Sequence, residues 1–236
     1  MSHAFGAIAE AYHRRRSEIP LAAFDWLVLQ PCRRAVELGA GTGIQTRRLA
    51  VFADETLAVE PDPNMRAAFA VDNAKLLAGT AEDIPVEDAT ADLVVAFESW
   101  HWFAQPQATC EAARVLRPGG TLAAAWNLPQ IDSDWTERFW WPVTSAHDEN
   151  RRPGRLILAT KAPFATPRYR VLHWTWRRHI DDLVALLGTY SRVLALDPVE
   201  REEFLDRQRS TVPTEPDGTV DVRFTTVCWR TVHKGA

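Results

Sequence analysis

The segment Val36–Gly43, with the sequence VELGAGTG, constrains the fold of this chain more than any other feature. It follows a short apolar run at 34–38 and precedes a helical pattern at 45–52. Glycines suit such a loop because the turn is tight and because a ligand can approach a backbone that carries no Cβ. In open α/β sheets, the loop at the carboxyl end of the first strand is where ligands bind. The segment therefore predicts a ligand-binding strand–loop–helix unit.

Short apolar strands alternate with helical patterns up to about residue 127. The chain begins with helical patterns over 4–29, and helices are expected further on at 45–52, 63–71 and 106–116. Strands are expected at 34–38, 56–60, 75–78, 92–97 and 121–126, with Pro118-Gly119-Gly120 breaking the chain before the last of them. Nearly continuous apolar strands that alternate with helices predict a parallel sheet covered by helices on both faces.

The chain changes character after residue 127. Residues 128–166 are rich in Pro, Trp and charged side chains, which predicts a helical insertion that caps the site. An extended segment at 168–179, helices at 181–190 and 198–210, and an alternating strand at 220–233 follow. Because no repeat or linker separates these parts, we expect a single domain over 1–236, with a ligand-binding core at 34–127.

Charge and cysteine content limit the possible partners. The net charge is −4 and no basic stripe is present, so we expect no nucleic-acid partner. The three cysteines are far apart, which predicts neither disulfides nor a zinc site but reduced, mostly buried thiols. Neither a signal peptide nor an apolar run of about 18 residues is visible, so we expect a cytoplasmic protein with no membrane partner. No cluster has metal-ligand spacing, and no metal is expected.

Glu60 ends the second predicted strand, about 20 residues after the glycine loop, and is placed to accept hydrogen bonds from the two hydroxyls of a ribose. This pair fits either a nicotinamide cofactor or S-adenosylmethionine. A dinucleotide fingerprint requires a small residue where this chain has Ile44. Glu37 would also repel a diphosphate, whereas it would attract a sulfonium or an amino group. The spacing thus favours S-adenosylmethionine.

At this point VELGAGTG resembles the first motif of the class I S-adenosylmethionine-dependent methyltransferases. Segments at 58–65, 79–85, 92–97 and 113–120 resemble the later motifs of that family, in the family's order, so that the resemblance covers 34–127. It implies a doubly wound, Rossmann-like α/β fold with a mostly parallel, seven-stranded sheet whose last strand is antiparallel.

Other segments resemble one branch of this family, the type 11 methyltransferases that include trans-aconitate methyltransferase-like enzymes. These segments are 12–16 with Pro20, 99–103, 188–193 and 224–230. Ser17 stands where that branch usually has a proline.

The resemblance implies a set of residues around S-adenosylmethionine and its product S-adenosylhomocysteine. Arg16 would pair with the cofactor carboxylate, or be a solvated helix charge. Met65 would pack near the adenine, or in the core, and Glu82 would reach the adenine edge, or solvent. With Glu37, the expected cofactor-binding residues are Arg16, Glu37, Gly39, Ala40, Gly41, Glu60, Pro61, Met65, Ala81, Glu82, Phe97, Glu98 and Ser99.

The acceptor end is predicted from aromatic clusters and one histidine. His101 is the candidate general base for a hydroxyl or carbon acceptor, or a packed histidine satisfied by backbone. The chain has ten tryptophans, which fill either the core or an apolar acceptor pocket. Arg192 would suit an acidic acceptor, which needs no base. The expected pocket residues are Trp100, Trp102, Trp140, Trp141, Tyr190 and Arg192.

Three functions remain at this stage. The favoured one is methyl transfer to a small molecule, perhaps a carboxylate or hydroxyl, by direct displacement, with catalysis mainly from positioning. The alternatives are a protein that binds S-adenosylmethionine or S-adenosylhomocysteine without methyl transfer, and an NAD-dependent oxidoreductase, against which Ile44 argues. The sequence leaves open the acceptor, the atom that is methylated, and whether the protein is a monomer or a homodimer.

Overall fold

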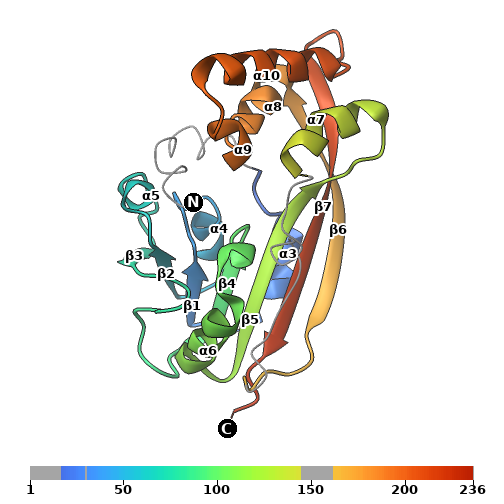
Figure 1. Ribbon diagram of the computed structural model, residues 1–236. Helices are drawn as coiled ribbons and strands as arrows, with labels where there is room; N and C mark the ends of the chain where they lie inside the picture. Colours follow the sequence, from blue (N-terminus) through green and yellow to red (C-terminus); the bar gives the residue numbers. More distant parts are fainter. Residues whose placement is uncertain (1–16, 30, 145–161, 236) are drawn as a thin grey trace.

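The computed structural model describes residues 17–29, 31–144 and 162–235, which form one twisted sheet with helices on both faces and at one end (Figure 1). The seven strands are ordered β3-β2-β1-β4-β5-β7-β6. Their bounds are β1 Arg34–Leu38, β2 Glu55–Glu60, β3 Lys75–Ala78, β4 Ala91–Phe97, β5 Leu116–Pro129, β6 Arg168–His179 and β7 Thr219–Val232. β1 to β5 pair in parallel, and β7 is antiparallel to both β5 and β6. The predicted seven-stranded, doubly wound sheet with an antiparallel last strand is confirmed.

The helices agree with the prediction in position and differ in length. They are α3 Leu21–Leu27, α4 Thr46–Leu49, α5 Pro63–Ala67, α6 Gln105–Val115, α7 Asp134–Thr144, α8 Ile180–Leu187, α9 Ser191–Leu194 and α10 Pro198–Thr211, with a 3₁₀ turn, η1, at Trp100–Trp102. The predicted helix 63–71 ends early, at Ala67, and Val71 beyond it lies close to Gly43, where an added Cβ would be 2.6 Å from the Val71 Cγ2. None of the described helices is long and apolar enough to cross a membrane.

The two faces of the sheet carry separate hydrophobic clusters, because successive residues of a strand point to opposite faces. On one face, Val36 and Val94 pack with α6. On the other, Val95 packs with α3 and α4. Two of the three cysteines, Cys32 and Cys228, lie in this second cluster, whereas Cys110 is exposed, so the expectation of buried thiols is wrong for Cys110.

A third cluster occupies the end of the molecule where Figure 1 shows α7, α8, α9 and α10 grouped around the ends of β6 and β7. Trp140 of α7 packs here with Leu187 of α8 and Phe224 of β7. The helical insertion predicted over 128–166 is represented by α7, and residues 145–161 lie outside the described residues. Because α7 packs with elements from 180–211, this helical layer draws on more of the chain than the predicted insertion.

We expected the segment Pro118-Gly119-Gly120 to separate α6 from the next strand, but it does not. β5 begins at Leu116, directly after α6, and the segment forms an irregularity inside it. Gly119 adopts a φ of 83° and donates its N–H to the His233 carbonyl. Gly120 accepts a hydrogen bond from the His233 N–H, so the ladder with the end of β7 continues through the glycines.

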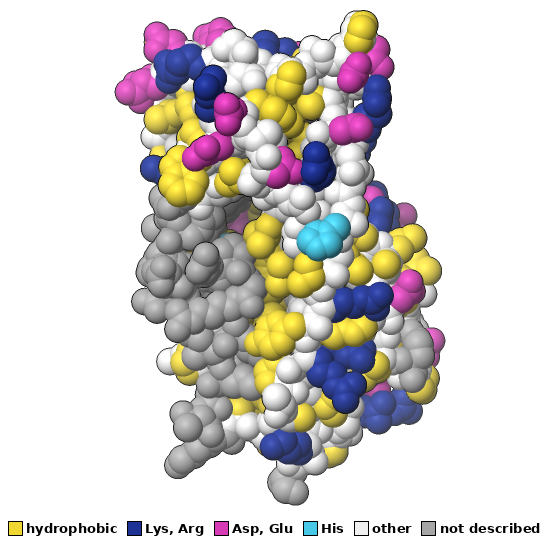
Figure 2. Space-filling view, turned by 90° about the vertical axis from the view of Figure 1, so that its right-hand side faces the viewer, with side chains coloured by type: hydrophobic (Ala, Val, Ile, Leu, Met, Phe, Trp, Pro, Cys, Tyr) yellow, Lys and Arg dark blue, Asp and Glu magenta, His cyan; other side chains and the backbone are white. Residues whose placement is uncertain are grey.

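β6 is a long, exposed edge strand. Arg168, Arg170, Arg177 and Arg178 lie along it, and it has no acidic residue. Figure 2 shows Lys and Arg side chains gathered over the lower part of the face that includes this edge. Charged side chains on an edge strand oppose pairing with the strand of another molecule.

The buried carboxylate of Asp92 connects the starts of β1 and β4. One oxygen accepts hydrogen bonds from the Arg33 and Arg34 N–H groups at 2.9 and 2.8 Å, and Arg117 pairs with the other. We predict that Asp92→Ala lowers the free energy of unfolding by roughly 2–4 kcal/mol, because three donors lose their acceptor. Urea denaturation measures this. Glu87→Ala, which removes an exposed carboxylate 3.7 Å from Arg34, is the control and should change stability little. Equal effects of the two variants would contradict the assigned role of Asp92.

Candidate functional site

The glycine loop between β1 and α4 is held against the end of β2. The N–H groups of Gly39 and Ala40 both donate to the Val59 carbonyl, at 2.9 and 3.1 Å. The N–H of Gly41 donates to Glu60 Oε2 at 2.8 Å. Because β1 and β2 are adjacent parallel strands, these bonds fix the loop over the carboxyl edge of the sheet.

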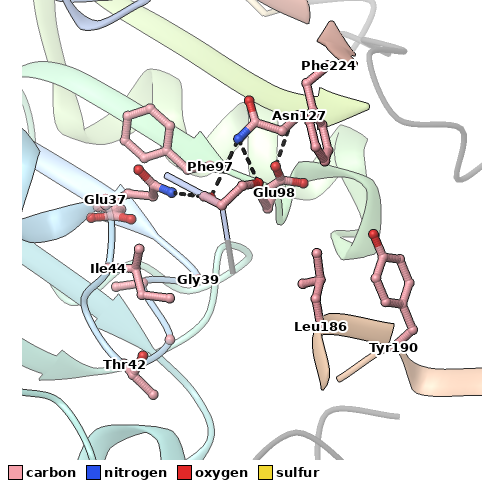
Figure 3. Close-up of a pocket in the computed structure, with 14 residues that line it drawn as sticks. Glu37, Gly39, Thr42, Ile44, Phe97, Glu98, Asn127, Leu186, Tyr190 and Phe224 are labelled. Atoms are coloured by element: carbon pink, nitrogen blue, oxygen red, sulfur yellow. Dashed lines mark hydrogen bonds between the residues drawn. The ribbon is translucent and has the colours of Figure 1, made fainter. Parts of the chain in front are cut away.

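A pocket opens beside this loop, between the carboxyl edge and the helical end of the molecule (Figure 3). The residues on the loop side are Ser17, Glu37, Gly39, Ala40, Gly41, Thr42, Ile44, Gln45 and Phe97. The other lining residues come from the ends of β4, β5 and β7, from α8 and from the segment after it: Glu98, Asn127, Phe224, Leu186 and Tyr190. Figure 3 shows Glu37, Ile44 and Thr42 across an open space from Leu186 and Tyr190. The pocket thus has two chemically different ends.

Glu37 is a buried acid at the loop end. It is 1 % exposed, and its Oε2 has no hydrogen-bond partner. Burial raises the pKa of Glu37 to about 8, an interaction with the Thr46 hydroxyl opposes the rise, and the charge of Glu60 adds to it. A buried polar atom without a partner is costly, so this end of the pocket favours a ligand that brings a donor or a positive charge.

Gly41 leaves space above the loop. A Cβ on Gly41 would meet no atom within 4 Å, whereas a Cβ on Gly39 would lie 2.8 Å from the Ser99 Cβ. Gly41 and Glu37 both line the pocket. A ligand can therefore approach the Gly41 backbone directly.

Glu98 and Asn127 form the polar part of the opposite end. The Asn127 N–H donates to Glu98 Oε1 at 2.7 Å. The Asn127 amide donates to the Ser17 hydroxyl at 3.1 Å and accepts from the Thr226 hydroxyl at 2.7 Å. The Ser99 hydroxyl donates to the Leu38 carbonyl at 2.8 Å, which ties the loop after β4 to the end of β1.

Phe224 of β7 forms the aromatic wall of this end. It is 2 % exposed and stacks on Trp174 with ring centroids 5.1 Å apart. Trp140 lies behind it, 6.0 Å from Phe224 and 6.3 Å from Tyr190 between ring centroids. The pocket wall is therefore supported by packed tryptophans.

Several residues expected to bind the cofactor lie on the pocket wall: Glu37, Gly39, Ala40, Gly41, Phe97 and Glu98. Others lie around it. Glu60 is 6 % exposed beneath the loop, and its Oε1 accepts from the Asp62 N–H at 2.8 Å. Burial raises the pKa of Glu60, which the backbone hydrogen bonds from Asp62 and Gly41 oppose.

The remaining cofactor candidates do not line the pocket. Met65 and Ala81 are buried in packing, and Pro61 is exposed with its carbonyl bonded to Arg66. Glu82 accepts the Ala104 N–H at 2.7 Å, so it joins its loop to the start of α6. Ser99 holds Leu38, as described above. Arg16 lies outside the described residues.

The expected acceptor residues are mostly elsewhere. Of that set, Tyr190 lines the pocket. Trp100 is fully buried against Trp229, with ring centroids 5.2 Å apart, because its side chain faces α6 rather than the pocket. Trp102 and Trp141 are exposed at the surface.

Arg192, the expected partner of an acidic acceptor, is exposed and donates to the Pro142 carbonyl at 2.8 Å, which ties α9 to α7. It is not among the described residues that line the pocket.

His101, the predicted general base, is 7 % exposed and likewise does not line the described pocket. Its Nδ1 accepts a hydrogen bond from the Trp126 indole N–H at 3.0 Å. This partner is a side chain, whereas the packed alternative expected from the sequence was a histidine satisfied by backbone. No group of three His, Cys, Asp or Glu side chains in the described part of the chain could hold a metal ion.

The structure adds pocket residues that sequence reasoning missed. Thr42, Ile44 and Gln45 continue the glycine loop, and their position after the glycines was a usable signal. Asn127 is a polar residue at the end of an apolar strand, and this position was a weaker signal. Ser17, Leu186 and Phe224 carry no local signal, because only the fold brings their elements to the loop.

The sequence of this chain is similar to those of known methyltransferases. A model of a methyltransferase domain matches residues 36–124. A Mycobacterium tuberculosis protein described as an uncharacterized methyltransferase is 34% identical, with 98% of this chain and 96% of that protein covered. The chain belongs to this methyltransferase family. An uncharacterized methyltransferase of Schizosaccharomyces pombe is 30% identical to it, with 92% of each protein covered.

Solved structures agree as well. A structure from Anaeromyxobacter dehalogenans, described as a candidate type II methyltransferase, matches with a TM-score of 0.71 and 25% identity, over 91% of this chain and 97% of that one. This chain therefore resembles methyltransferases in both its sequence and its fold. S-adenosylmethionine is the family's cofactor, as the sequence predicted.

The titration of Glu37 gives a prediction for stability. A carboxyl whose pKa is raised in the folded state stabilises the fold below its unfolded value of 4.5, and this contribution is lost as the pH rises to about 8. Glu37→Gln cannot ionise, so its free energy of unfolding should fall less than that of the wild type over this range. Denaturant unfolding at several pH values measures the difference. The exposed Glu203→Gln should behave as the wild type, and a Glu37→Gln profile parallel to the wild type would argue against a raised pKa.

Proposed function

We propose that this protein transfers a methyl group from S-adenosylmethionine to a small-molecule acceptor, by direct displacement, in the pocket between the glycine loop and the helical end. One observation carries the proposal: the buried, unpartnered Glu37 oxygen and the uncovered backbone of Gly41 belong to residues that line the same pocket. Both match a ligand with positively charged groups that lies close to the loop.

The residues present fit this cofactor. Glu37 would hold its positively charged part, and Gly39, Ala40 and Gly41 would lie along it. Glu60 would bind the ribose, because a carboxylate offers about four acceptor positions and its two backbone hydrogen bonds leave capacity. Bound S-adenosylmethionine supplies a methyl group that is already activated by its sulfonium.

The chain itself would position the acceptor against the cofactor and exclude water from the pocket. Leu186, Tyr190 and Phe224 close the side opposite the loop with apolar and aromatic surface. A nucleophile held between them and the loop would meet the methyl group in a restricted geometry, which is the main source of rate in such a displacement.

We also propose that this chain is related to the type 11 branch, which includes trans-aconitate methyltransferase-like enzymes. This relationship does not identify the substrate, because the proposed acceptor end lies outside the matched residues 36–124. That end is formed by Asn127, Leu186, Tyr190 and Phe224. Function in a shared fold depends on such local sites.

Calorimetric titration tests the proposed cofactor and separates it from the alternatives. We expect micromolar binding of S-adenosylhomocysteine and no binding of NADH. Transfer of label from methyl-labelled S-adenosylmethionine to a panel of small phenols, amines and acids should follow. Binding without transfer to any of them would favour the non-catalytic alternative, and absence of binding by protein freed of any co-purified cofactor would refute the proposal.

Two glycine variants test the position of the cofactor. Gly41 and Gly119 both adopt a positive φ, 58° and 83°, and a Cβ on either would meet no atom within 4 Å. Alanine therefore strains the backbone at both positions, but of the two only Gly41 lines the pocket. We predict that Gly41→Ala weakens S-adenosylhomocysteine binding at least tenfold, whereas Gly119→Ala leaves it unchanged at a similar loss of thermal stability. Equal affinities would place the cofactor elsewhere.

A further inference from the structure

Three arginines share one face of the sheet where β6 begins and β7 ends. Arg168 of β6 is directly opposite Arg230 of β7, and Arg170 is opposite Cys228. Cross-strand partners and residues two apart in a strand lie on the same face, so the three arginines project from one face. This is the part of the β6 edge over which Lys and Arg side chains gather (Figure 2). We call these three residues the arginine cluster.

Arg230 of this cluster is held in place by α3. Its guanidinium carbon lies 4.6 Å from the ring centroid of Trp26, and its Nη1 donates to the Trp26 carbonyl. Burial lowers the pKa of Arg230, and the charges of Arg168 and Arg170 lower it further. Because arginine keeps its proton at neutral pH, the three positive charges repel one another.

No described carboxylate offsets this repulsion. Among the residues that the structure describes, none of the three arginines forms an ion pair with an acidic side chain. Arg177, near the other end of β6, instead lies 3.6 Å from Asp217 and 3.7 Å from Asp221. Like charges directly opposite each other destabilise a sheet. The cluster therefore lowers stability unless an anion binds to it.

The arginine cluster is separate from the pocket at the glycine loop. None of its three residues is among the described residues that line that pocket. From the pocket residue Phe224 to Arg230, β7 continues for roughly 20 Å of extended strand. An anion bound at the cluster would therefore occupy a second site, independent of the proposed methyl transfer.

We propose that Arg168, Arg170 and Arg230 form a binding site for the terminal phosphate of a phosphomonoester. Such a group carries a charge of about −1.5 to −2 at pH 7 and presents three strong acceptor oxygens. Each guanidinium offers paired N–H donors that match two of these oxygens. Because neighbouring strands lie about 4.8 Å apart, the three side chains can converge on one phosphate. A carboxylate, with one charge and two oxygens, would neutralise the cluster less completely.

Calorimetric titration of the full-length protein with ethyl phosphate and with propionate tests the site. The two anions have similar apolar parts and differ in the charged group. The titrations are done at one low ionic strength, because salt screens interactions at the surface. We expect ethyl phosphate to bind at least tenfold more tightly than propionate. Equal binding of the two anions, or binding of neither, would overturn the proposal.

Two substitutions identify the side chains responsible. Arg168→Gln and Arg170→Gln each remove one charge from an exposed side chain. Each should weaken ethyl phosphate binding at least tenfold. Without phosphate, each variant should melt at the wild-type temperature or higher, because a like charge has been removed from the cluster. A purely structural role would instead lower the melting temperature. Arg177→Gln, in the same strand but beside Asp217 and Asp221, is the control and should bind ethyl phosphate as the wild type does.

Two further measurements separate this site from other sources of the same chemistry. Sedimentation with phosphatidylcholine vesicles that contain phosphatidic acid, without binding of ethyl phosphate, would assign the arginines to a lipid surface and overturn the inference. S-adenosylhomocysteine binding should be the same in the wild type and in both cluster variants. Its loss in the variants would place the arginines at the cofactor and overturn the second site, whereas its absence from the wild type would refute only the proposed function.

Discussion

The buried carboxylate of Glu60 is the interaction on which the site depends. Its two oxygens accept the N–H groups of Gly41 and Asp62, at 2.8 Å each. The first bond sets the path of the glycine loop, and the second sets the turn into α5. Because the carboxylate is withdrawn from water, these charge-assisted bonds are strong and leave the loop one arrangement. The empty space over Gly41 and the exposure of Glu37 to the pocket follow from that arrangement.

Glu37 and Glu60 are neighbours with different tasks. Glu60 is satisfied by backbone donors, whereas the Glu37 Oε2 is buried with no partner. A protein that keeps such an atom loses stability unless a ligand satisfies it. The glycine-loop end of the pocket, where we propose that the cofactor binds, therefore lacks an interaction that a positively charged ligand would supply.

The acceptor end is built differently. Its polar groups are ordered by a chain of hydrogen bonds from Trp174 through Thr226 and Asn127 to Glu98. Its apolar wall is Phe224, backed by the packed tryptophans of the helical end. This part lies mostly outside the region that the methyltransferase domain model matches, 36–124.

The local sequence determined the half of the site that contains the glycine loop. The glycine loop, the acid in the strand before it and the acid about 20 residues later act through the backbone of adjacent parallel strands, so their spacing along the chain predicts their meeting in space. The seven strands and the antiparallel last strand came from the resemblance to the family, whereas the strand order came from the structure. The glycine loop and the two acids could be predicted because they lie in neighbouring strand–loop–helix units.

Only the tertiary structure decided the acceptor half. Asn127, Leu186, Tyr190 and Phe224 come from separate elements and meet across a long stretch of the chain. Composition could not tell Trp100, which faces the core, from Tyr190, which faces the pocket, because both are aromatic residues near element ends. Nor could it show that His101 receives the Trp126 indole N–H, or that Arg192 bonds a carbonyl of α7. Which way a side chain points depends on how the helices pack on the sheet, and that is a long-range property that no local pattern records.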